Sequence, residues 1–402
     1  MKIRFVVLTL AVAAGAFLLV GGATAAKAAA PPAGPCTMPT AASGTTAETA
    51  WRLFVAANCP GSGTQLVWES WTEQDQVYPA SGKVGKLAAG KTRRLHGSPL
   101  AHATMARKAG LTAELTPSTE CNKMGGPPSN VIPNATICEE ARLNPAAKLF
   151  VISKGYEVRS GQTAAAQKGT NIQFPKAAVE VKVDWIPASD FQPPFTCANP
   201  PQGVHVETID GACYAMAGIH IASKLKPDWI WATFEPQNLQ TNPNRCITFG
   251  ACNDPWGSVP ATSNGGQAGF TKLSPALEVL MKSAHLAPEF LNYRMDGVQT
   301  EFGTAANPTL LGNSIIEGEN VGMTAGTASC ITCHSVSTIE NNGTDGITLL
   351  NNQVGPQYVP LVGWIARDFV WSLALACPGG IQSCTSTAAV KDPRKKAKPT
   401  GK

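Results

Sequence analysis

Twelve cysteines among 402 residues constrain this chain more than any other feature of its sequence. Cys330 and Cys333 are separated by two residues. None of the other ten cysteines has this spacing, and each of them can be paired with a neighbour along the chain. Such cysteines are typical of disulfides that tie loops together, and each bond contributes about 2–4 kcal/mol by restricting the unfolded chain. The simplest pairing joins Cys36–Cys59, Cys121–Cys138, Cys197–Cys213, Cys246–Cys252 and Cys377–Cys384.

The N-terminus has the pattern of an export signal. Lys2 and Arg4 precede an apolar run over residues 5–20, and small residues that a signal peptidase prefers follow over 21–26. We therefore expect residues 1–26 to be a cleaved signal peptide and the mature protein to reach the periplasm, where disulfides form. The alternative is a retained membrane anchor, because the apolar run is almost long enough to span a bilayer. Only in that case, with the signal peptide uncleaved, would the chain be inserted in a membrane.

The net charge of +5 comes from the two ends of the chain. The signal peptide carries two positive charges, and a basic tail over residues 389–402 carries a net five, so the part between them is close to neutral. Without an extended basic face, this part is not expected to bind nucleic acid. The tail is expected to be disordered and solvated, with docking to an acidic partner or a membrane surface as the alternative.

Residues 27–290 are expected to form a β-rich α+β domain. Apolar and polar residues alternate with period two over 179–185, which predicts a half-buried strand. Further strands are predicted over 148–153, 214–222 and 229–234. Two tryptophans on one face of the last strand, Trp229 and Trp231, are expected to pack in the core or against a ligand.

Helices are predicted where capping residues precede an apolar pattern. One begins near Thr45 and runs through Val55, and another begins after Ser274, with proline at its first position. A short helix is predicted over 288–293, and an apolar helix over 361–376. The fold class is therefore α+β, with an antiparallel sheet, flanking helices and long disulfide-tied loops.

The sequence Cys330-Ile331-Thr332-Cys333-His334 is the motif that indicates chemistry. Two thiols at this spacing form thioether bonds to the vinyl groups of haem, and the following imidazole reaches the iron. A shuffled sequence of this composition contains such a motif only about 0.005 times. A thioredoxin-type redox pair would need a strand before Cys330, and a structural zinc site would need two more clustered ligands. Neither pattern is present in the sequence.

The motif resembles that of c-type cytochromes, and residues 229–235 and 293–333 look more loosely like large bacterial periplasmic proteins with a C-terminal cytochrome c-like segment. The resemblance implies one covalent haem c, attached through Cys330 and Cys333, with His334 as the proximal ligand of the iron. The helix expected over 361–376 is similar to the helix that packs over haem in small cytochromes. Residues 291–388 are accordingly expected to form a helical haem c-binding segment.

The second axial ligand departs from the cytochrome pattern, in which a methionine follows the motif. Here no methionine or histidine follows His334, so the ligand comes from upstream, is another type of atom, or is absent. The leading upstream candidates are His220, Met295 and Met323. Met216 is expected on the same face of its strand as His220, because four residues separate them. The remaining candidates are His205, Met281 and His285.

Electron transfer is the function that this pattern favours, because a six-coordinate haem in an apolar pocket exchanges one electron with a redox partner protein. The first alternative is a haem enzyme, peroxidase-like or acting on a small molecule, with an open or displaceable distal position. The second alternative is a haem-based sensor or binding protein.

Overall fold

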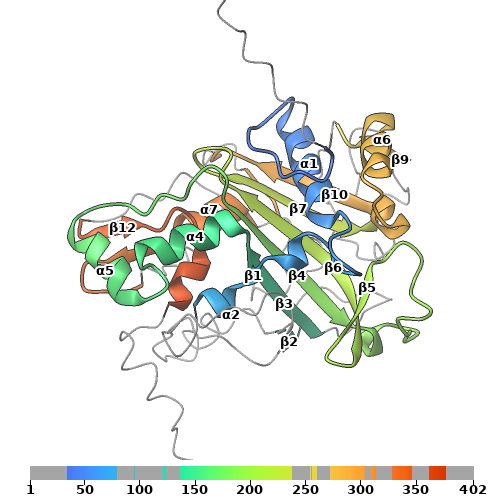
Figure 1. Cartoon of the computed structure of the whole chain (residues 1–402), viewed down its shortest axis with the longest axis horizontal. Coiled ribbons are helices and arrows are strands. Elements are labelled where there is room, and N and C mark those ends of the chain that lie inside the picture. The colour runs from blue at the N-terminus through green and yellow to red at the C-terminus, as the bar shows by residue number, and fades with distance from the viewer. Residues whose placement is uncertain are drawn as a thin grey trace, which may run out of the picture. The chain divides into compact units, whose positions relative to one another are not determined.

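An antiparallel sheet of eight strands lies at the centre of the residues that the structure describes (Figure 1). This computed structural model describes residues 34–78, 95, 121–123, 136–237, 254, 256–259, 272–303, 309–313, 328–345 and 362–376. The strand order is β1 (Thr72–Glu73), β3 (Thr136–Leu143), β4 (Val179–Pro187), β6 (Ala212–Ser223), β7 (Ile230–Pro236) and β10 (Tyr293–Gln299), with β2 (Asn122–Lys123) beside β3 and β5 (Val206–Ile209) beside β6.

The two faces of this sheet bury different sets of side chains. Along β4, Val181 and Val183 enter one hydrophobic cluster, whereas Lys182 and Asp184 point to the other side, as the alternation of a strand requires. We call the first side the α1 face, after the helix that covers it. The second side is the motif face, because the Cys330–His334 motif lies there.

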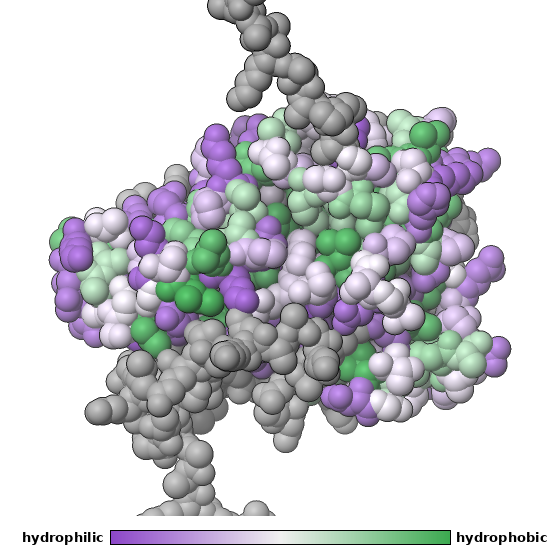
Figure 2. Space-filling model, in the orientation of Figure 1, coloured by the Kyte–Doolittle hydropathy of each residue, from purple (hydrophilic) through white to green (hydrophobic). Residues whose placement is uncertain are grey.

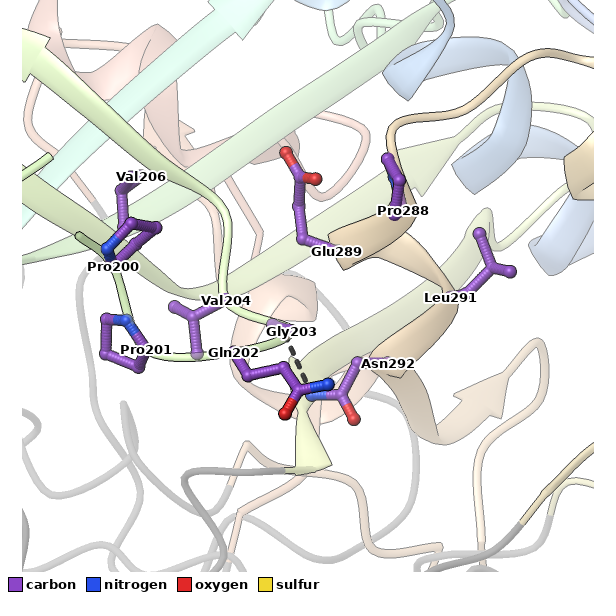
Figure 3. Close-up of a pocket in the computed structure, with 10 residues that line it drawn as sticks. All are labelled: Pro200, Pro201, Gln202, Gly203, Val204, Val206, Pro288, Glu289, Leu291 and Asn292. Carbon is purple, nitrogen blue, oxygen red and sulfur yellow. Dashed lines mark hydrogen bonds between the residues drawn. The ribbon is translucent and has the colours of Figure 1, made fainter. Parts of the chain in front are cut away.

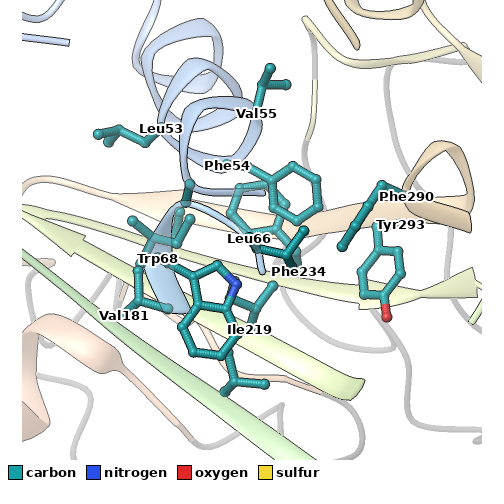
Figure 4. Packing of buried hydrophobic residues seen from close by; sticks show 14 of the residues in the cluster. Leu53, Phe54, Val55, Leu66, Trp68, Val181, Ile219, Phe234, Phe290 and Tyr293 are labelled. Carbon is teal, nitrogen blue, oxygen red and sulfur yellow. The ribbon is translucent and has the colours of Figure 1, made fainter. Parts of the chain in front are cut away.

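Helix α1 (Thr46–Asn58) covers the α1 face. Thr45 begins it, since its hydroxyl accepts a hydrogen bond of 3.0 Å from the backbone N–H of Glu48. The ring of Phe54 lies 4.5 Å from that of Phe234 on β7. Figure 4 shows the surrounding cluster, which includes Leu66, Trp68, Val181, Ile219, Phe290 and Tyr293. Helix α6 (Pro275–Ser283) and the 3₁₀ helix η4 (Pro288–Asn292) add to this side.

The motif face is covered by helices from two parts of the chain. Helices α4 (Pro145–Lys154) and α5 (Arg159–Gln167) meet the C-terminal segment there, which contains α7 (Cys330–Ser335), β11 (Thr338–Glu340), β12 (Trp364–Ala366) and η6 (Trp371–Leu375). β11 and β12 pair with each other. The hydrophobic cluster on this face joins all of these parts, with Leu143, Val151, Trp231, Ile331 and Leu373 among its members.

The remaining elements are short. They are η1 (Trp68–Ser70), α2 (Gln74–Val77), η2 (Ala188–Asp190) and the paired strands β8 (Ser258–Val259) and β9 (Lys272–Leu273). Among the described residues, no helix has both the length and the apolar character needed to cross a membrane. Figure 2 shows hydrophilic and hydrophobic residues interspersed over the visible described surface.

The structure confirms the α+β class, the antiparallel sheet and several elements predicted from the sequence. The strand predicted over 179–185 is β4, and those over 214–222 and 229–234 are β6 and β7. Helices α1 and α6 begin at the predicted caps, and the hydroxyl of Ser274 accepts the N–H of Leu277.

The strand predicted over 148–153 is wrong, because these residues lie in helix α4. Asn144 caps the helix by accepting the N–H of Ala147 at 2.9 Å, and Pro145 occupies its first position. Gly155 ends the helix with a φ of 71°, the left-handed conformation that glycine adopts most readily. A short apolar run does not distinguish a strand from a helix, so the capping residues decide the structure here.

The helix predicted over 361–376 is also wrong. Its described residues form β12 and then η6. Between them Asp368 and Phe369 have φ angles of 52° and 69°. Two successive left-handed residues cannot continue an α-helix, so the apolar stripe of this segment packs as a strand and a 3₁₀ turn.

The short helix predicted over 288–293 corresponds to η4, which leads directly into β10. This strand pairs with β7 from Tyr293 to Gln299. The predicted haem-binding segment over residues 291–388 therefore contributes β10 to the same sheet as the predicted domain over residues 27–290. Residues from Gly34 onward form one compact unit.

Disulfides are present at three of the five predicted positions, Cys36–Cys59, Cys121–Cys138 and Cys197–Cys213. The other two predicted pairs, Cys246–Cys252 and Cys377–Cys384, lie outside the described residues. So do the predicted signal peptide, the basic tail and Met323.

Candidate functional site

The motif begins helix α7, and Gln299 at the end of β10 holds that beginning in place. The side-chain oxygen of Gln299 accepts the N–H of Ile331 at 3.1 Å, and its amide nitrogen donates to the carbonyl of Thr309 at 2.8 Å. The same nitrogen lies 3.3 Å from the hydroxyl of Ser329. The strand therefore positions the motif through a fully engaged, buried amide.

Cys330 and Cys333 remain thiols, whereas the other six cysteines in the described ranges form disulfides. Cys330 is partly exposed, and its sulfur lies 3.5 Å from the carbonyl of Leu311. Cys333 is 8% exposed. The two thiols thus lie one turn apart on α7, and Cys330 packs against the hydrophobic cluster of the motif face.

His334 has a defined orientation and protonation. Its Nδ1 lies 2.8 Å from the carbonyl oxygen of Phe369. A carbonyl only accepts, so Nδ1 carries the proton and Nε2 keeps its lone pair. Burial, together with the nearby positive charge of Lys182, lowers the pKa of His334 to about 4. The imidazole is therefore neutral at neutral pH, which is the form that binds metals.

The carbonyl that fixes His334 belongs to a strained piece of backbone. The left-handed φ angles of Asp368 and Phe369 cost of order 1–3 kcal/mol each for residues other than glycine. The side chain of Asp368 holds the turn in place: one oxygen pairs with Lys224 Nζ at 2.5 Å, and the other accepts the N–H of Phe174 at 2.7 Å. Strain of this kind persists where the surrounding structure imposes it, and it is typical of functional sites.

Aromatic rings pack beside His334. The ring of Trp231 on β7 lies 4.3 Å from that of His334, with the planes tilted by 42°. The ring of Phe369 lies 6.1 Å from Trp231 and 6.0 Å from Phe302. These apolar rings keep one side of the imidazole out of water.

Ionisable side chains cross three neighbouring strands on the motif face. Lys182 Nζ lies 2.5 Å from Glu139 on β3 and 3.7 Å from Asp184. His220 on β6 is paired in register with Lys182, and its Nε2 lies 3.5 Å from an oxygen of Asp184. The pKa of His220 is well below its usual value, first because of burial and then because of the positive charge of Lys182. His220 and His334 thus share one electrostatic environment.

The candidate Met295 lies on the other side of the sheet. It is fully buried in the cluster of the α1 face and is opposite Phe234 in register. The sheet therefore separates Met295 from His334. Met281 belongs to the same cluster.

The prediction that Met216 shares a face with His220 is wrong. β6 contains a bulge, since Gly218 is opposite Asp184 while Met216 is opposite Trp185, which leaves one residue of β6 without a counterpart. The bulge shifts the alternation by one position. Met216 therefore enters the core of the α1 face, and His220 points to the motif face.

The remaining histidine candidates have other surroundings. In His205, Nδ1 lies 3.1 Å from Glu289 and Nε2 lies 2.9 Å from Glu207, so both ring nitrogens are engaged by carboxylates. His285 follows helix α6 with a left-handed φ of 54°. Of the upstream candidates in the described part of the chain, His220 is the one that the structure places on the motif face.

A cavity of about 600 Å³ lies apart from the motif residues, between the segment before β5 and η4 (Figure 3). Asn292 donates to the carbonyl of Gly203 at its base, at 2.8 Å. Its lining is Pro200, Pro201, Gln202, Gly203, Val204, Val206, Pro288, Glu289, Leu291 and Asn292. None of the residues predicted to carry chemistry lines this cavity.

The strand β4 carries a carboxyl whose ionisation should influence stability. Burial raises the pKa of Glu180 from 4.5 to about 7, although Lys182 opposes the shift. The folded state then holds this proton more tightly than the unfolded state, so the contribution of Glu180 to stability is greatest below pH 4.5 and falls as the pH rises towards 7. Because Glu180 is partly exposed, we expect a loss of about 2 kcal/mol rather than the full value of the shift.

The measurement is urea unfolding of the wild type and of Glu180→Gln at pH 4.5 and pH 8. The amide does not ionise, so the variant should lose about 2 kcal/mol less than the wild type between the two pH values. An equal loss in both proteins would contradict this assignment to Glu180.

The sequence pointed to the motif but missed what orients it. Gln299 carries no recognisable pattern, and the carbonyl of Phe369 is a backbone group that any residue could supply. Among the described residues, no group of three or more His, Cys, Asp or Glu side chains is placed to bind a metal ion. Comparison of the chain with protein-family models, with curated proteins and with solved structures finds no match.

Proposed function

We propose that this protein is an exported c-type cytochrome that carries one covalent haem and transfers electrons to or from a redox partner protein. Cys330 and Cys333 form the thioether bonds, and His334 binds the iron from the proximal side. Haem supplies the one-electron chemistry, and the chain supplies attachment, orientation and a partly apolar environment.

The observation that carries the proposal is the hydrogen bond between His334 and Phe369. It places the proton on Nδ1, so that Nε2 is the nitrogen left to bind iron. A metal-binding histidine commonly donates its other N–H in this way, because the bond fixes the ring and makes the ligand more basic. The left-handed backbone at Asp368 and Phe369 agrees with a functional role, since strained residues are frequent at functional sites.

The chemical state of the cysteines agrees with haem attachment. Three disulfides fit a periplasmic location, which the signal-like N-terminus also indicates. The motif cysteines are thiols at helical spacing, as thioether formation requires. An iron held by a porphyrin takes only one or two ligands from the protein, so a larger ligand cluster is not needed.

Electron transfer is favoured by the position of the motif. Cys330, His334 and Phe369 are each partly exposed, whereas Trp231 and Ile331 beside them are buried. One edge of a haem at this site would therefore be close to the surface, where a partner protein can exchange electrons with it. Within the proposed haem-binding segment over residues 291–388, α7 would be the helix that carries the thioether bonds.

The test is to produce the full-length chain in a bacterium with an active haem c maturation system. We expect the mass of the purified protein to include one haem that survives denaturation, and a low-spin spectrum that carbon monoxide leaves unchanged. Absence of added mass would refute haem attachment. A high-spin spectrum that responds to carbon monoxide would refute electron transfer and would support the enzyme alternative.

A further inference from the structure

We propose that His220, from the middle of the sheet, is the second axial ligand of the iron. This inference rests on the proposed function, since it concerns the same haem. It joins two parts of the chain that are 114 residues apart in the sequence, His220 on β6 and His334 on α7.

The register of the sheet brings the two imidazoles to one area of the motif face. His220 is opposite Thr233 on β7, and Ala222 is opposite Trp231. Trp231 is therefore the diagonal neighbour of His220, at the roughly 7–8 Å usual for such pairs. Since the rings of Trp231 and His334 are 4.3 Å apart, both histidines are neighbours of the same tryptophan.

The bulge in β6 is what turns His220 towards the motif. Without the extra residue between Met216 and Gly218, residue 220 would share a face with Met216 and enter the core of the α1 face. A bulge disrupts the ladder of hydrogen bonds and is often found where a strand must re-aim a side chain near a site. Here the side chain that it re-aims is an imidazole.

The nitrogen of His220 lacks the partner that a buried polar atom normally has. Nε2 is buried and makes no hydrogen bond, and the nearest carboxylate oxygen, on Asp184, is 3.5 Å away. A buried polar atom is almost always satisfied, because leaving it without a partner costs about 1–3 kcal/mol. A bond to iron would satisfy the lone pair of a neutral imidazole.

Competing ligands in the described part of the chain are less suitable. His205 is engaged at both nitrogens by Glu207 and Glu289. Met295 lies behind the sheet in the core of the α1 face, as do Met216 and Met281.

The test compares spectra of purified, haem-loaded variants. His220→Ala should change the low-spin spectrum to high-spin and allow carbon monoxide to bind, and added imidazole should restore the low-spin form. His220→Met should stay low-spin with a higher reduction potential, because a thioether replaces an imidazole as ligand. His205→Ala is the matched control, and its spectrum should equal that of the wild type.

Each outcome decides between the two proposals. If the wild type carries no covalent haem, the proposed function fails. If haem is attached but His220→Ala keeps the wild-type low-spin spectrum, only the assignment of His220 fails. Should His220→Ala not accumulate as folded protein, an unchanged spectrum and potential in His220→Met would overturn the assignment equally well.

Discussion

Replacing both motif cysteines, in the variant Cys330→Ala/Cys333→Ala, should give a secreted protein that carries no covalent haem. Thioether bonds need the two sulfurs, and alanine supplies none. The three disulfides lie at other positions of the fold and should still form. The measurements are the mass of the denatured protein and haem staining after electrophoresis, with the wild type produced in parallel.

The matched control removes a different pair of cysteines, in Cys197→Ala/Cys213→Ala. This disulfide closes a loop with a sequence separation of 16 residues, so its loss should lower the free energy of unfolding by about 3 kcal/mol. Haem should nevertheless remain attached, because β5 and β6 do not supply the thiols. Loss of haem from both variants alike would show that attachment depends on overall folding, and the roles given to Cys330 and Cys333 would lose their support.

Arg142→Met should lower the free energy of unfolding by about 3–5 kcal/mol, which is a large part of the stability of an ordinary domain. The guanidinium of Arg142 is buried and lies 2.7 Å from Glu140 and 3.0 Å from Glu73. It also donates to the carbonyls of Glu69 and Trp71. Methionine fills a similar volume but leaves two buried carboxylates without this cation.

Urea unfolding at neutral pH measures the effect, and Arg52→Met provides the control. Arg52 pairs with Glu48 at the surface of α1, with 40% of its side chain exposed, so its loss should cost at most about 1 kcal/mol. Adding Glu140→Gln to Arg142→Met should recover part of the stability, because one uncompensated charge is removed. Equal losses in the two arginine variants would contradict the importance given to the buried cluster.

Local patterns in the sequence were sufficient to predict several helices and strands. The caps at Thr45 and Ser274 predicted the beginnings of α1 and α6, and period-two alternation predicted β4. The helix α4 could have been predicted as well, because Asn144 and Gly155 are ordinary cap residues on either side of it. The strand prediction relied on the apolar run over residues 148–153 and not on these two cap residues.

Non-local interactions determine what the sequence did not reveal. The left-handed backbone of Asp368 and Phe369 is held by Lys224, which is 144 positions earlier in the chain. The bulge in β6 directs Met216 and His220 to opposite faces of the sheet, and it depends on the pairing between β4 and β6. Such features come from tertiary contacts, so neither periodicity nor propensity can indicate them.

The depth of the motif has a consequence for the biogenesis of the protein. The sulfur-bearing residue Cys333 is 8% exposed, and Gln299 fastens the first turn of α7 to the last strand of the sheet. If haem is attached as proposed, the maturation enzyme would have to reach both sulfurs before this strand docks, or wait for the segment to open. The described disulfides all lie upstream, between residues 36 and 213, so the earlier part of the chain can be crosslinked while the last part is still accessible.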